Sequence, residues 1–144
     1  MSLAFFDSNI LVYTEDASAP LKQKKANSLL DDHLTADTAV LSLQVLQEYF
    51  ATITHKLHVP AERAQRRVEI LSCAKIVRFE IADVIAAIEF HRLTQISFWD
   101  AMIVHAARIG GTATLYSEDF QHGSTLGGVR IVNPFMPVRE ATTD

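Results

Sequence analysis

The sequence has the length of one domain and a modest negative charge. Its 144 residues are 49% hydrophobic and 21% charged, and the formal net charge is −4. These values are typical of a globular chain with one core, and they argue against a surface that binds nucleic acid indiscriminately. Apolar runs are too short to cross a bilayer, and the N-terminus lacks a secretory pattern, so we expect a cytoplasmic protein without membrane contact.

Cysteine, proline and glycine usage predicts one continuous domain. Cys73 is the only cysteine, which excludes intrachain disulfides, and its apolar neighbours predict that it fills the core. Proline and glycine are few, and no repeat or low-complexity segment interrupts the chain. We therefore expect a single domain over residues 1–137 and a loose polar tail over 138–144.

The first strong signal is an apolar run, Leu3 to Phe6, that stops at Asp7. Four apolar residues without polar alternation predict a strand covered on both faces, as in a parallel sheet. Ligands in such sheets gather beyond the carboxyl ends of strands, which makes Asp7 a candidate site residue. Asp7 or Ser8 could instead cap a helix that runs from Asn9. Both interpretations stay open at this point.

Alternating helices and strands follow up to about Leu57. A short helix continues from Ile10, and a second helix starts near Leu21. The apolar residues 39–42 predict a strand, and a helix with an apolar stripe follows it. Glu48 lies roughly 130° from the middle of that stripe at about 100° per residue, so helical periodicity predicts that it faces solvent.

The second half of the chain repeats this alternation. Helices are expected from Pro60 to about residue 74, over 81–94 and over 98–109, with strands at 75–79, 112–116 and 129–132. In the helix over 81–94, the side chains expected to face inward are Val84, Ile85, Ile88 and Phe90. Such an alternation predicts a parallel sheet with right-handed crossovers.

Two more acids stand at element boundaries. Ser97 and Asp100 fit a capping box at the start of the helix over 98–109, and a helix N-terminus favours an ionised carboxylate. Asp119 follows the strand over 112–116, as Asp7 follows the first strand. If these two strands are neighbours where the winding reverses, Asp7 and Asp119 face each other, and Asp100 could join them.

Basic residues form two groups on expected helices. The first comprises Lys22, Lys24 and Lys25, and the second Arg63, Arg66 and Arg67. Such groups are commonly solvated helix faces, and they are also suited to contacts with phosphates.

Five motifs in order resemble the PIN domain family, and within it the VapC-type toxins of bacterial toxin–antitoxin pairs. The motifs are Asp-Ser-Asn-Ile-Leu at 7–11, Glu48, Phe-Trp-Asp-Ala at 98–101, Ser-Glu-Asp-Phe at 117–120, and Asn-Pro-Phe at 133–135. The resemblance implies a three-layer α/β/α fold around a mostly parallel, five-stranded sheet.

The resemblance also implies a metal-dependent ribonuclease. Its catalytic and metal-binding acids map onto Asp7, Glu48, Asp100 and Asp119, with Asn9 and Ser117 as supporting positions. For Glu48 this disagrees with helical periodicity, and we follow the resemblance. Carboxylate ligands suit Mg²⁺ or Mn²⁺. The implied partners are RNA, contacted by the two basic groups, a small VapB-like antitoxin and a second copy in a homodimer.

Other functions fit the residues less well. A non-catalytic PIN-like module could hold a basic peptide or RNA in the acidic crevice. His55 and His58 lack the further ligands of a zinc site, and Ser117 lacks a nucleophile elbow. A haloacid-dehalogenase-like phosphatase would want a second aspartate at the position of Asn9.

Overall fold

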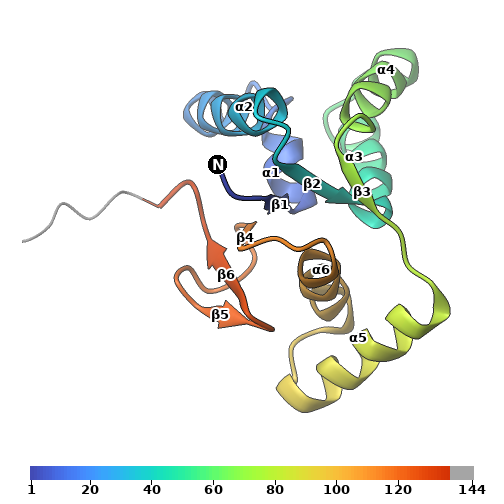
Figure 1. The fold of residues 1–144 in the computed structure, drawn as a ribbon. Coiled ribbons are helices and arrows are strands. Elements are labelled where there is room, and N and C mark those ends of the chain that lie inside the picture. Colours follow the sequence, from blue (N-terminus) through green and yellow to red (C-terminus); the bar gives the residue numbers. More distant parts are fainter. Residues whose placement is uncertain (137–144) are drawn as a thin grey trace, which may run out of the picture.

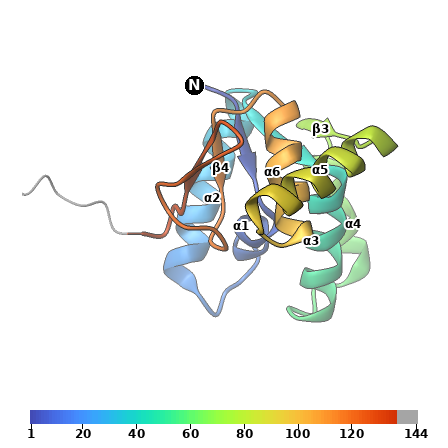
Figure 2. The same ribbon diagram turned by 90° about the horizontal axis from the view of Figure 1, so that it is seen from below.

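The structure, a computed structural model, describes residues 1–136 and folds them as a sheet between two layers of helices. The strands are β1 (Ala4–Phe6), β2 (Ala39–Ser42), β3 (Lys75–Val77), β4 (Thr114–Tyr116), β5 (Thr125–Leu126) and β6 (Val129–Val132). The helices are α1 (Ser8–Tyr13), α2 (Pro20–Thr35), α3 (Leu43–His55), α4 (Ala61–Leu71), α5 (Ile81–Thr94) and α6 (Phe98–Ile109). Figure 1 shows α1 to α4 on one side of the sheet and α5 and α6 on the other. Figure 2, seen from below, has α5 and α6 nearest the viewer. The expected three-layer α/β/α fold is confirmed.

The sheet has the order β3-β2-β1-β4-β6-β5, and only the β5–β6 pair is antiparallel. The winding reverses between β1 and β4, because the chain first builds the sheet outward through β2 and β3 and then returns to the other side of β1. The carboxyl ends of β1 and β4 therefore lie side by side, which is where ligands bind in open α/β sheets.

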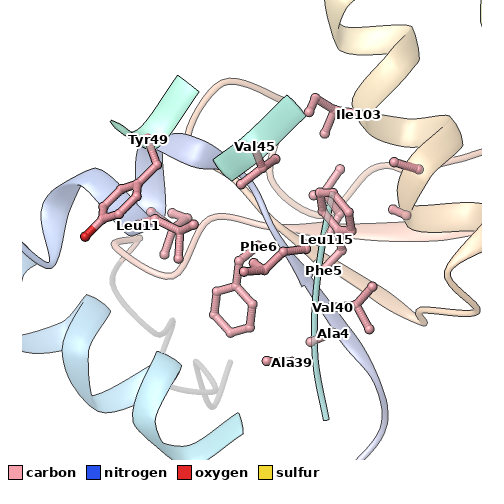
Figure 3. Packing of buried hydrophobic residues seen from close by; sticks show 14 of the residues in the cluster. Ala4, Phe5, Phe6, Leu11, Ala39, Val40, Val45, Tyr49, Ile103 and Leu115 are labelled. Carbon is pink, nitrogen blue, oxygen red and sulfur yellow. The ribbon is translucent and has the colours of Figure 1, made fainter. Parts of the chain in front are cut away.

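The core is densest around the central strands. Phe5, Phe6, Val40 and Leu115 are fully buried, and Figure 3 shows them packed with residues of α1, α3 and α6. Helices cover both faces of β1, and its residues Ala4–Phe6 are all apolar and buried. Asp7, the next residue, is therefore the first polar side chain at the carboxyl end of this strand.

The sheet has six strands, and the prediction of five missed β5. This strand has two residues and pairs with β6 across Gly127 and Gly128, whose φ angles are +56° and +81°. Two consecutive positive φ angles are required by the tight hairpin turns that match strand twist, and glycine adopts them without strain. The Gly-Gly pair was visible in the sequence, but a two-residue strand has no periodicity to detect.

Two burial predictions are wrong. Ile85 and Ile88 on α5 are 51% and 41% exposed, and Cys73 is exposed rather than buried. Helix α5 packs mainly on α6 and lies outside it, so its apolar residues outnumber the positions that its one contact face can bury. Cys73 lies in the turn between α4 and β3, beyond the end of the helix that was expected to carry it inward.

Most helix boundaries were predicted within a few residues. The largest difference is at α4, which ends at Leu71 rather than near residue 74. The predicted tail over 138–144 lies outside the described residues.

Across residues 1–136, the helices are too short or too polar for any of them to span a membrane.

Candidate metal and catalytic site

Asp7 connects β1 to α1, and the residue is only 4% exposed. Its Oδ1 accepts a hydrogen bond from the backbone N–H of Ser8 at 2.7 Å, so Asp7 caps α1. Its Oδ2 accepts hydrogen bonds from the hydroxyl of Ser117 at 2.7 Å and from the amide of Asn9 at 3.4 Å. The two interpretations left open by the sequence are therefore compatible, because one oxygen caps the helix while the other is directed toward the residue after β4.

Ser117 connects the ends of β1 and β4. It is fully buried, and its Oγ donates to Asp7 while it accepts from the backbone N–H of Asp119 at 3.1 Å and from the Asn9 amide at 3.3 Å. Asn9 also accepts, through Oδ1, a hydrogen bond from the backbone N–H of Glu118 at 3.2 Å. Asn9 and Ser117 thus hold the first acid and the backbone of the last acidic segment in fixed relation.

Glu48 lies beside the start of α1 rather than in open solvent. The hydroxyl of Ser8 donates to its Oε2 at 2.8 Å, and Gln44, one turn earlier on α3, donates to its Oε1 at 2.6 Å. The side chain is partly buried, so the prediction from helical periodicity was wrong. Sequence analysis missed the contacts of Ser8 and Gln44, although the spacing of Gln44 and Glu48 on a helix predicts that they touch.

The surroundings of Asp7 make its ionised form less favourable than it is in water. Burial is the largest cause and raises the pKa of its carboxyl to about 6. Hydrogen bonds from Ser117 and Ser8 lower the pKa in part, whereas the like charges of Asp119 and Glu48 raise it. An ionised Asp7 is therefore costly in the metal-free protein.

Asp100 belongs to the same electrostatic group. It lies in the first turn of α6, and its backbone N–H donates to the Oγ of the N-cap Ser97 at 3.0 Å, as the capping pattern predicted. Burial raises the pKa of its carboxyl, the Ser97 contact lowers it, and Asp119 and Glu48 raise it. Since Asp119 and Glu48 act on both Asp7 and Asp100, each of the four acids is within electrostatic range of at least two others.

The donor set suits a hard divalent cation. Carboxylate oxygens are the ligands that Mg²⁺ and Mn²⁺ prefer, and a cation would remove the repulsion that raises the pKa values of Asp7 and Asp100. Within residues 1–136, however, no three aspartate, glutamate, histidine or cysteine side chains already converge as a metal-binding group. The acids share one end of the sheet, and their convergence on an ion is a proposal.

Sequence analysis missed a charged cluster next to the acids. Glu118 accepts hydrogen bonds from Tyr13 at 2.8 Å and from Lys22 at 2.6 Å, and the Lys22 ammonium lies 4.8 Å from the centre of the Tyr13 ring. The hydrogen bond to Glu118 is the main reason that the pKa of Lys22 is raised. Lys22 thus anchors the segment that carries Asp119, in addition to any contact with RNA.

The second basic group is also used partly within the fold. Glu15 has a side chain that is 5% exposed, and its carboxylate lies 3.0 Å from Arg67 Nε and 3.6 Å from Arg63 Nη2. Tyr49 donates to the same carboxylate at 3.3 Å. Arg66 is exposed and has no acidic partner within 4 Å among the described residues. Only part of this group is free to bind a phosphate.

Comparison with protein families decides the assignment. A family model described as PIN domain matches residues 4–124, a span that contains all four acids and the alternating β/α elements from β1 to β4. The chain belongs to the PIN domain family. The resemblance seen in the sequence is therefore confirmed. Comparison with curated protein sequences finds no match.

Solved structures share the fold of this PIN domain. A chain of a toxin–antitoxin complex from Klebsiella pneumoniae superposes with a TM-score of 0.66 at 17% identity, over 92% of this chain and 98% of the other. VapC20 from Mycobacterium tuberculosis, described as a toxin that cleaves the sarcin–ricin loop, superposes with a TM-score of 0.63 at 17% identity, over 81% of this chain and 89% of the other. At this identity the likeness shows a common fold.

Proposed function

We propose that this PIN domain is a metal-dependent endoribonuclease that acts as a VapC-like toxin. The observation that carries the proposal is that Ser117 joins Asp7 and the backbone of Asp119 at the adjacent carboxyl ends of β1 and β4. Glu48 on α3 and Asp100 on α6 lie near enough to act on the same group of charges. Membership of the PIN family and the fold shared with a toxin that cleaves RNA support it. The acids Asp7, Glu48, Asp100 and Asp119 would hold the metal ion.

The residues of the chain have distinct roles in this proposal. A bound Mg²⁺ or Mn²⁺ would supply positive charge beside a phosphate oxygen and a water of lowered pKa. Ser117 and Asn9 both donate to one oxygen of Asp7 and hold it toward the end of β4. Ser8 and Gln44 each donate to one oxygen of Glu48 and fix the orientation of that carboxylate. Supporting hydrogen bonds of this kind fix ligand orientation and tune affinity.

The proposal is tested by RNA cleavage with purified protein. We expect Mg²⁺ or Mn²⁺ to support cleavage of single-stranded RNA, and we expect a chelator or the substitution Asp100→Asn to abolish it. Asp100 lies at a helix start where asparagine keeps the size of the side chain, so the fold should persist, as circular dichroism would verify. Metal binding without cleavage would instead favour the non-catalytic binding module.

Protein partners are a second part of the proposal. We propose a VapB-like antitoxin and a homodimer, supported by the toxin–antitoxin complex whose chain shares this fold. Exposed apolar side chains on α3 and α5 supply surface that a protein partner could cover, namely Leu43 and Phe50 on α3 and Ile81, Ile85 and Leu93 on α5. Light scattering of the protein alone, and copurification with the product of an adjacent small reading frame, would test the two partners separately.

The two arginines Arg66 and Arg67 should respond differently to neutralisation. Arg67→Met leaves the buried Glu15 carboxylate with Arg63, at 3.6 Å, as its one cationic partner, so we expect a loss of about 1–2 kcal/mol in the free energy of unfolding. Arg66→Met should change stability by less than about 0.5 kcal/mol and should flatten the salt dependence of RNA binding. Urea unfolding and binding titrations at several salt concentrations measure both effects. Equal stability of the two variants would contradict the structural role of Arg67.

A further inference from the structure

A groove with both polar and apolar lining lies between α1 and α3, next to the acids, and its apolar part comes from Val12, Tyr13 and Leu57. A pocket of about 300 Å³ is lined by Ser8 and Asn9 at the start of α1, by Asp16 beyond its end, and by Thr52 and Lys56 of α3 and its C-cap. Its volume is at the lower end of the range for small-molecule sites, which suits one nucleotide. The roles assigned above to the acids and the two basic groups do not use this groove.

The groove is continuous with the candidate site. Ser8 lines the groove and donates its hydroxyl hydrogen to Glu48, and Asn9 lines the groove and contacts Asp7. Glu48, Thr52 and Lys56 are spaced four residues apart, so they form one row along α3. At 1.5 Å per residue, Lys56 lies about 12 Å along the helix from Glu48. A strand held at the acids could therefore extend along this row.

The far end of the groove carries two complementary groups. Lys56 has no acidic side chain within 4 Å among residues 1–136, so its ammonium is available to a phosphate. Asp16 receives both hydrogen bonds from Ser18 on Oδ1, at 3.0 Å from the backbone N–H and 2.6 Å from the hydroxyl. Its Oδ2 therefore remains free to accept another hydrogen bond, and a carboxylate can only accept.

We propose that this groove binds a nucleotide flanking the scissile phosphate of single-stranded RNA. Lys56 contacts a phosphate that is not cleaved, and Asp16 accepts a hydrogen bond from an exocyclic amino group. The groove therefore favours adenine, guanine or cytosine, which carry an exocyclic amino group, over uracil, whose one donor on this edge, N3–H, lies between two carbonyl oxygens that a carboxylate repels. This inference rests on the proposed ribonuclease function and adds to it a site that discriminates between bases.

The experiment measures RNA binding without cleavage, in protein that carries Asp100→Asn. We expect Lys56→Met in this background to weaken binding of a mixed single-stranded oligonucleotide about three- to tenfold and to reduce the magnitude of the salt slope by about 0.7. The charge control is Lys75→Met, which removes the same charge where β3 begins, at the end of the sheet opposite the acids. Lys75 Nζ also donates to the Gly110 carbonyl at 2.8 Å, so the fold of this variant is checked by circular dichroism. An equal effect of the two substitutions would overturn the proposal.

The base preference is tested with a second variant. The parent protein should bind oligo(A) or oligo(C) more tightly than oligo(U), and Asp16→Asn should reduce that difference at least about threefold. Asparagine still accepts from Ser18, so circular dichroism and the melting temperature should be unchanged. A preference that survives in Asp16→Asn would refute the groove but leave the ribonuclease proposal intact. Absence of metal-dependent cleavage by the wild-type chain would instead refute the ribonuclease function.

Discussion

Replacing Asp7 by asparagine is expected to lower RNA cleavage on the order of 10³-fold and to stabilise the metal-free protein. The loss of activity follows because an amide has no negative charge and is a poor ligand for Mg²⁺. Single-turnover cleavage of single-stranded RNA measures this loss, and it should persist at all Mg²⁺ concentrations. Near-normal cleavage that is also insensitive to chelators would contradict the proposed mechanism.

The gain in stability follows from the pKa of Asp7. Its carboxyl has a pKa of about 6 in the folded chain, above the ordinary value of 3.8. Such a group favours folding most strongly below its unfolded pKa, and this contribution is lost as the pH rises through the folded pKa. By this linkage, the ionised group at pH 7 costs the folded state about 3 kcal/mol.

Asparagine recovers only part of this cost. Asparagine has one oxygen in place of two, so it cannot accept from both the Ser8 N–H and the Ser117 hydroxyl as Asp7 does. We therefore expect a net gain of about 1–2 kcal/mol at pH 7 and little gain at pH 4. Urea unfolding at the two pH values measures the difference. The control is Asp31→Asn, which changes an exposed carboxylate on α2 and should alter neither stability nor cleavage. A variant that is less stable than the wild type at pH 7 would contradict the pKa argument.

Divalent cations are expected to stabilise the wild-type protein strongly at pH 7 and weakly at pH 5. Metal binding requires the ionised carboxylates, so protons compete with the ion below pH 6, and affinity should fall about tenfold per pH unit there. At a concentration 100 times the dissociation constant, the ion should add about 2.7 kcal/mol to the free energy of unfolding. Removing the ion with a chelator should reverse this gain completely.

Thermal unfolding with and without Mg²⁺ or Mn²⁺ measures the effect, and calorimetry at pH 5, 6 and 7 measures the affinity and the protons released. The variant Asp7→Asn serves as control, because it lacks the carboxyl for which protons and the ion compete. A melting temperature that Mg²⁺ raises equally at pH 5 and pH 7 would show that the ion binds elsewhere.

Local sequence signals were sufficient for some of the candidate site. Asp7 ends an apolar strand and Ser97 with Asp100 forms a capping pattern, and both were located correctly because strand termination and capping depend on neighbours in the sequence. The contacts of Asn9 and Ser117 were suggested by the family resemblance, and the structure places them next to Asp7.

Periodicity failed where a helix has unequal surroundings. Glu48 is far around α3 from the apolar stripe, yet α1 crosses that flank and Ser8 supplies a hydrogen bond to it. Ile85 and Ile88 on α5 show the opposite error, because no element covers the outer face of that helix in residues 1–136. The hydrophobic period predicts which side chains share a face, and it does not reveal whether another element lies over that face.

The amino-acid sequence by itself determined the α/β architecture, most element boundaries and the acidic residues that end β1 and begin α6, because these depend on apolar runs and capping residues that are close in sequence. Only the tertiary structure decided which distant groups meet: Ser117 with Asp7, Ser8 with Glu48, and Lys22 with Glu118. The physical reason is the strand order, which places β4 beside β1 after more than 100 residues of intervening chain. Contacts across such a separation follow from packing of the whole sheet, and no local pattern encodes them.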